Sequence, residues 1–283
     1  MKAKTMVVAV VLFTGWSAVT AQADFKLTGT EHLDITESHA LGVLYDSSTA
    51  DVIGDGYVDW VYVNDSALLN VQPPSGDAIH TAMTYGSGRI EISSGNVYRV
   101  YSYEGSEANV TGGSITGFMY AHDNSTISVG GGSNADTLSA CESSTVTVSG
   151  GNVSKVRTYD SSKATIDGGS VPAVEAQDTS YVLVSGGEVG SLHAFDMRPL
   201  GPARVKVTAG TVDELSLDFV VQDDESFSFT GQLADLVPHG VVVSEGTVGS
   251  FRISTLESRL DDLARCWRRR RRPLGVSMVA GSG

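Results

Sequence analysis

The chain has 283 residues, among them 33 acidic and 19 basic side chains, which gives a net charge of −14 at neutral pH. This acidic excess repels nucleic acid and anionic lipid, so neither is an expected partner. The composition, with 32 glycines, 7 prolines and many Ser, Thr and Val residues, favours short strands joined by tight turns.

The N-terminus has the three parts of a secretory signal peptide. Lys2 and Lys4 precede an apolar run from Met6 to Phe13, and Ala21-Gln22-Ala23 offers small residues at the positions where signal peptidase cleaves. The alternative, an N-terminal anchor, is disfavoured because the apolar run is short for a membrane span. The sequence predicts a signal peptide over residues 1–23 and a secreted, periplasmic or cell-surface protein that starts at Asp24. No later segment is apolar enough to span a bilayer.

The stretch from Asp51 to Asp59 resembles the start of a calcium loop. Acids stand at positions 1, 5 and 9, and Gly56 stands at position 6. Ile53 and Tyr62 occupy positions 3 and 12, where oxygen ligands belong. An ordinary turn of the repeat described next explains the same residues better.

Repeated units cover the middle of the chain. Five consecutive units begin at Ala108, Ile127, Val146, Ala164 and Val182. Each contains a glycine pair, whose second member falls at Gly113, Gly132, Gly151, Gly169 and Gly187. The spacings are 19, 19, 18 and 18 residues. The pattern extends upstream to Gly95 and downstream to Gly210 and Gly246, with an insertion around Pro199–Pro202.

Each unit follows the same internal pattern. In the third, Val146 and Val148 alternate with threonine, a glycine turn follows, and Val153 and Val156 form a second apolar stretch before a turn at Asp160. A coil of 18–19 residues cannot bury its apolar face alone, but stacked coils can. The sequence therefore predicts an all-β fold, a right-handed parallel β-helix over residues 24–254. A left-handed hexapeptide helix fits poorly because its apolar residues recur every six positions, and a β-sandwich does not require near-identical units.

These GG-x-V…Y-x-x-D-S-S units resemble the repeats of secreted bacterial β-helix proteins, which occur in planctomycetes and often carry a PEP-CTERM sorting signal. The resemblance covers roughly residues 31–254 and implies a solenoid fold and export, but no specific activity. The chain departs from the sorting signal, because it has the terminal arginines without the Pro-Glu-Pro motif or the apolar span.

An acidic residue recurs in the second turn of the units. The set is Asp46, Asp65, Glu104, Asp123, Glu142, Asp160, Asp178 and Asp196. In a solenoid these carboxylates stack into an edge of like charges. The favoured explanation is that each acid caps its own turn. The sharper hypothesis is a cation site, with calcium as the cofactor, along Asp123, Glu142, Asp160, Asp178 and Asp196, or contact with a basic partner.

The sequence offers no recognisable catalytic motif. Asp223-Asp224-Glu225 is the one dense acidic cluster in the repeat region, and a solvated loop explains it better than the paired carboxylates of a glycosidase do. The six histidines show no metal-ligand spacing. Residues 255–283 form a basic tail, expected to be a short helix or disordered. Cys141 and Cys266 are too far apart in the sequence to suggest a local pair.

The sequence favours an exported, non-enzymatic solenoid with a structural, surface or adhesive role. Tyr98, Tyr101, Tyr103 and Tyr120 either enrich a contact face or fill the core. The alternative is a carbohydrate-active enzyme or carbohydrate-binding module on the same scaffold, since fold does not decide function. Carbohydrate or another cell-surface component is the expected partner class.

Overall fold

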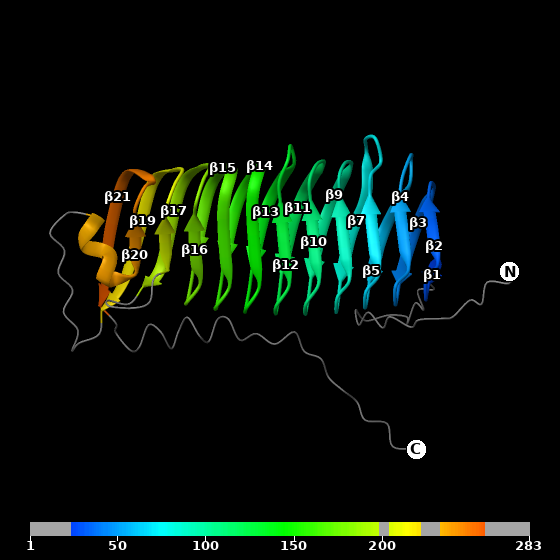
Figure 1. Cartoon of the computed structure of the whole chain (residues 1–283), viewed down its shortest axis with the longest axis horizontal. Coiled ribbons are helices and arrows are strands. Elements are labelled where there is room, and N and C mark those ends of the chain that lie inside the picture. The colour runs from blue at the N-terminus through cyan, green and yellow to red at the C-terminus, as the bar shows by residue number, and fades with distance from the viewer. Residues whose placement is uncertain (1–23, 198–203, 222–232, 258–283) are drawn as a thin grey trace, which may run out of the picture.

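The computed structural model describes residues 24–197, 204–221 and 233–257, and within these ranges the fold is a parallel β-solenoid. Each coil contributes one short strand and one long strand, and the strands pair in parallel throughout the described ranges. This arrangement confirms the predicted parallel β-helix and rules out a sandwich. Figure 1 shows the coils stacked side by side along one axis in chain order.

The short strands form one sheet, here called the short-strand sheet. Its members are β2 (His32–Ile35), β4 (Thr49–Val52), β6 (Leu68–Val71), β8 (Arg89–Ile92), β10 (Glu107–Val110), β12 (Thr126–Val129), the first part of β14 (Thr145–Thr158) and of β15 (Lys163–Ala176), β16 (Tyr181–Val184), β18 (Val205–Val207) and β20 (Val241–Val243).

The long strands form the long-strand sheet. Its members are β1 (Phe25–Leu27), β3 (Ser38–Leu44), β5 (Tyr57–Val63), β7 (Asp77–Thr84), β9 (Asn96–Ser102), β11 (Ser114–Ala121), β13 (Asn134–Ala140), the second part of β14 and β15, β17 (Glu188–Met197), β19 (Thr211–Val221) and β21 (Thr247–Glu257).

The apolar pattern places five inward side chains in a regular coil. In β4 and β5 these are Ala50, Val52, Val58, Val61 and Val63, all fully buried. In β5, residues 59 and 60 both point outward between the buried Val58 and Val61, and the long strand turns a corner at these two residues. Because equivalent residues of successive coils are in register, the buried residues form one continuous core along the stack.

The glycine turns lie at a corner of the coil where the backbones of neighbouring coils approach closely. Gly151, Gly169 and Gly187 have φ of 71°, 76° and 72°, and a Cβ at Gly169 would lie 2.5 Å from the carbonyl oxygen of Gly151. The alignment of Gly132 with this slot is wrong. Asn134 pairs with both Ser114 and Asn152, so Ser133 occupies the slot, and the positive φ of 59° belongs to Gly131.

The coil length changes toward the C-terminal end. Val182 and Val205 pair although 23 residues separate them, and Val205 and Val241 pair across 36 residues. The expected insertion around Pro199–Pro202 and the acidic cluster at 223–225 fall outside the described residues, as does the predicted signal peptide. The 3₁₀ helix η1 (Leu233–His239) precedes β20.

The start of the expected tail belongs to the repeat fold, because β21 continues to Glu257 and includes residues 255–257. Residues 258–283 lie outside the described ranges. Within the described ranges, no helix has the length and apolarity of a membrane span.

Candidate functional site

The acidic edge is built into the backbone of the turns. Its eight acids, from Asp46 to Asp196, are also the non-glycine residues with positive φ in the described ranges, at values from 54° to 62°. Asp tolerates this left-handed conformation better than most residues do, which explains why an acid or glycine recurs there. In two coils that lack the acid, Gly29 and Gly86 take the position, with φ of 67° and 66°.

The carboxylates of this edge bond to neighbouring coils. The Glu142 carboxylate accepts a hydrogen bond from the Asp123 N–H at 3.0 Å, and Asp160 accepts one from the Glu142 N–H at 3.3 Å. Equivalent bonds join Gly29 to Asp46, Asp46 to Asp65, Gly86 to Glu104, Glu104 to Asp123, and Asp160 to Asp178. The structure thus differs from the expected capping of the residue's own turn, because these seven carboxylates each cap the preceding coil.

Adjacent carboxyl groups on the edge also interact directly. A hydrogen bond between the side chains of Asp123 and Glu142 lowers the pKa of Asp123 and raises the pKa of Glu142. The cation hypothesis for Asp123, Glu142, Asp160, Asp178 and Asp196 stays a prediction, now beside a structural role for the same carboxylates.

Sequence reasoning missed a buried polar row beneath the acidic edge. The third residue of each D-S-S turn points inward, and Ser106, Ser125, Ser144, Ser162 and Ser180 are fully buried. The Ser162 hydroxyl donates to the Tyr159 carbonyl at 2.7 Å and accepts from the Tyr159 N–H at 3.1 Å. The recurrence of Ser two residues after the acid was the available indication.

Aromatic side chains gather on the outer surface of the long-strand sheet. Tyr85, Tyr103 and His122 form one row, with ring centroids 5.0 Å apart at each step and planes within 10°. Tyr101 and Tyr120 form a second, parallel row with centroids 5.5 Å apart at 7°. We call these five residues the aromatic face. All five are half-buried and point outward, so the core-filling alternative does not hold for the tyrosines among them.

The spacing of these rings determines which of their atoms are exposed on the outer surface. Two coplanar rings cannot approach to 5.0 Å without overlap of their edges, so the rings stack face against face along the coil axis. Their edges and polar atoms are therefore what the outer surface presents. Burial raises the pKa of Tyr85 and of Tyr103, and both phenols stay protonated hydrogen-bond donors at neutral pH.

A pocket of about 260 Å³ lies near the start of the long strands and shares no lining residue with the aromatic face. The rings of His80 and Tyr98 stack there at 5.0 Å, and Asp77 and Asn96 also line it. Tyr98 thus lines a surface pocket and does not fill the core. This volume lies just below the range of about 300–1,000 Å³ that is usual for small-molecule sites.

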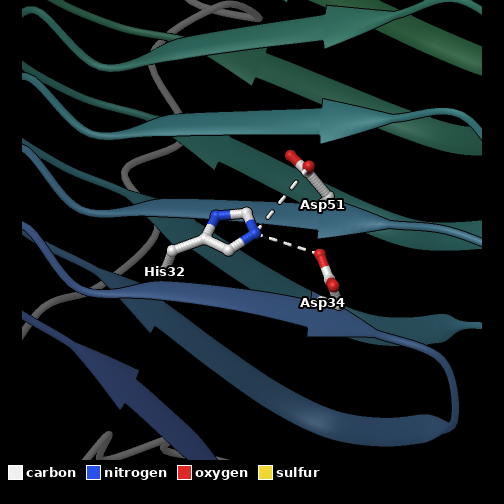
Figure 2. A group of neighbouring side chains, drawn as sticks. All are labelled: His32, Asp34 and Asp51. Atoms are coloured by element: carbon white, nitrogen blue, oxygen red, sulfur yellow. Dashed lines mark hydrogen bonds and ion pairs between the residues drawn. The ribbon is translucent and has the colours of Figure 1, made fainter.

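A cluster of three potential metal ligands lies at the opposite sheet, near the N-terminal end of the stack (Figure 2). Asp34 and Asp51 are opposite one another in β2 and β4, and His32 Nε2 lies 3.0 Å from Asp34 Oδ1 and 4.0 Å from Asp51 Oδ2. The resemblance of Asp51–Asp59 to a calcium loop, which the sequence already disfavoured, has no counterpart in the fold of these residues. Asp51 belongs to strand β4, whereas Asp59 lies in β5 beside His80.

Cys141 lies in the aromatic row after His122 and forms no disulfide with any described residue. Burial raises the pKa of its thiol to about 11, so the thiol is protonated and unreactive at neutral pH. Cys266 falls outside the described residues, so a pair with Cys141 stays untested.

No protein-family model, curated protein or solved structure matches this chain.

Proposed function

We propose that the protein is an exported, non-enzymatic rod that contacts carbohydrate or other cell-surface material through the aromatic face. Export rests on the N-terminal sequence pattern. The contact role rests on one observation, which is that two rows of aromatic side chains continue over neighbouring coils on one outer face.

The chemistry of the aromatic face supports binding to an extended polar polymer. Phenol hydroxyls recur at the coil spacing, the His122 imidazole continues one row, and tyrosine provides contact area at low cost in conformational entropy. The rod holds these groups in fixed register, because each ring stacks on its neighbour and each strand is paired on both sides. A repeating polysaccharide has a matching repeat of hydroxyl groups.

Adsorption of the purified chain to insoluble probes tests the proposal. The probes are cellulose, chitin and peptidoglycan sacculi, and the variant is the double substitution Tyr101→Ser and Tyr120→Ser. The expected result is adsorption of the wild type to at least one probe and at least a tenfold weaker affinity for the variant.

Tyr181→Ser is the matched control, because Tyr181 points outward from β16 on the other sheet. Equal adsorption by the double variant and the wild type would overturn the proposal, as would loss of adsorption in the control.

A carbohydrate-active site is the second candidate, favoured by the pocket of His80, Tyr98, Asp77 and Asn96. In this pocket region the Asp59 carboxylate is 3.5 Å from His80 Nδ1 and accepts from the Tyr57 hydroxyl at 3.4 Å. Release of reducing ends from soluble polysaccharides, abolished by Asp77→Asn, would favour this candidate. Binding without release would favour the non-enzymatic rod.

A further inference from the structure

Three donor atoms converge on the outer surface of the first two coils, far from the aromatic face in sequence and on the other sheet. They are His32 Nε2, Asp34 Oδ1 and Asp51 Oδ2, which lie within 4.8 Å of one another. Figure 2 shows the imidazole lying between the strands, with both carboxylates turned toward the same ring nitrogen. The side chains are 49%, 58% and 23% exposed, so an ion can reach all three from solvent.

Two residues outside the cluster orient these donors. The Thr49 hydroxyl lies 2.7 Å from His32 Nδ1, and the Asn70 amide donates to Asp51 Oδ1 at 2.7 Å. The first contact leaves Nε2 facing the carboxylates, and the second leaves Oδ2 as the free oxygen of Asp51. Partners of this kind fix the orientation of ligands and the tautomer of histidine in metal sites.

The same contact accommodates the proton of the imidazole. In the tautomer that carries the proton on Nε2, Nε2–H donates to Asp34 and Nδ1 accepts from the Thr49 hydroxyl. When Nε2 ligates an ion, the proton resides on Nδ1 and donates to the Thr49 oxygen. Threonine serves both tautomers because its hydroxyl both donates and accepts.

The charges at this place also favour a cation. Asp34 and Asp51 are directly opposite in register on adjacent parallel strands, where like charges destabilise a sheet. On the acidic edge the carboxylates accept backbone N–H groups, whereas the facing oxygens of Asp34 and Asp51 turn to an imidazole nitrogen. His193 and Asp218 form a similar pair at 2.9 Å, but no second carboxylate among the described residues joins them in a cluster.

We propose that His32, Asp34 and Asp51 bind a transition-metal ion of the Zn²⁺ class, with water completing the coordination. One imidazole and two carboxylates suit this class. Calcium requires six to eight oxygen ligands, which this cluster does not supply. The site is independent of the proposed contact role of the aromatic face.

Calorimetric titration of the untagged, chelator-treated full chain with Zn²⁺ tests the site. The expected result is that His32→Gln and Asp51→Asn each lose one ion per chain, or bind it at least tenfold more weakly than the wild type. Asn70→Ala is expected to weaken the same binding event about tenfold, because it removes only the orienting amide. Calcium should not compete for this event.

His193→Gln is the matched control and should bind Zn²⁺ as the wild type does. Circular dichroism of the metal-free variants checks that each is folded, which is expected since the substituted side chains point outward. The proposal is overturned if wild type, His32→Gln and Asp51→Asn give the same isotherm, or if His193→Gln loses the same ion.

Discussion

Single residues in this chain divide into those that close each coil and those that vary on its surface. An acid in a left-handed conformation and a buried serine two positions later recur in the same turn. The acid satisfies a backbone N–H of the preceding coil, and the serine satisfies backbone groups inside its own. The acid and the serine therefore give every such turn the same structure. The outward positions that carry aromatic rings in some coils carry other residues elsewhere.

The role of the acids predicts how substitutions at Asp160 behave. Asp160→Ala loses both the tolerance of the left-handed conformation and the bond to the Glu142 N–H, so it should cost about 1–2 kcal/mol. Asp160→Asn keeps both features and should change the free energy of unfolding by less than about 0.5 kcal/mol. Urea unfolding measures the two values, and equal effects would contradict the inter-coil capping role.

The burial of the serine row predicts that only small side chains are tolerated at these positions. Ser144 is fully buried, and equivalent turns carry Ala67 or Gly88. Ser144→Ala should cost about 1 kcal/mol for the lost hydrogen bonds, whereas Ser144→Val should cost about 1–3 kcal/mol more through overpacking. Thermal unfolding of the two variants distinguishes them, and a valine variant as stable as the alanine variant would show that the slot is not tightly packed.

At the scale of the element, the glycine turns explain why coils can stack at strand spacing. A Cβ at Gly169 would lie 2.5 Å from the Gly151 carbonyl oxygen and would also occupy a positive φ. Gly169→Ala should therefore destabilise the protein by about 2 kcal/mol or more.

Gly132→Ala is the control from the same family of glycine pairs. Its added Cβ meets nothing within 4 Å and its φ is not in the left-handed range, so its free energy of unfolding should stay within about 0.5 kcal/mol of wild type. Chemical denaturation compares the two glycines, and a larger loss at Gly132 would mean that the sequence alignment, rather than the structure, has the correct register.

The aromatic face gives way to charged side chains farther along the long-strand sheet. Glu175 pairs with Lys155 at 3.0 Å and with Arg157 at 3.0 Å. Burial alone would raise the pKa of Glu175, but the two cations outweigh it and lower that pKa.

A lowered pKa in the folded state means that ionised Glu175 stabilises the fold above the unfolded pKa, and that this contribution is lost as pH falls through the folded value. Glu175→Gln should thus cost up to about 1 kcal/mol at neutral pH and progressively less below about pH 4. Unfolding midpoints at both pH values test this, and a cost that grew on acidification would contradict it.

For the whole molecule, the sequence predicted the fold class well. Because the units repeat, the apolar pattern found in one coil supports the same strand assignment in all the others. The prediction that Val146, Val148, Val153 and Val156 and their equivalents point inward was correct. The fifth inward position, at Thr158, was missed because it holds small or polar residues, such as Ser102 and Ala140, that hydrophobic periodicity does not mark.

Candidate sites were harder to predict because they depend on contacts between coils. His32 and Asp51 are 19 residues apart in the sequence and meet only through the register of β2 and β4. The direction of the Asp160 carboxylate toward the preceding coil likewise depends on stacking. Neither contact has a signature within one repeat, so the sequence pointed to an ordinary repeat turn at Asp51 and to own-turn capping at Asp160.

We predict that the solenoid holds its acidic edge with its own backbone N–H groups and needs no cation there. Thermal unfolding of the purified chain in excess calcium and in excess chelator tests this most directly. The structure predicts the same unfolding midpoint in both, because the edge carboxylates already accept backbone hydrogen bonds. A rise of many degrees in calcium, reversed by chelator and abolished by Asp160→Asn, would contradict the claim and make the edge a calcium site.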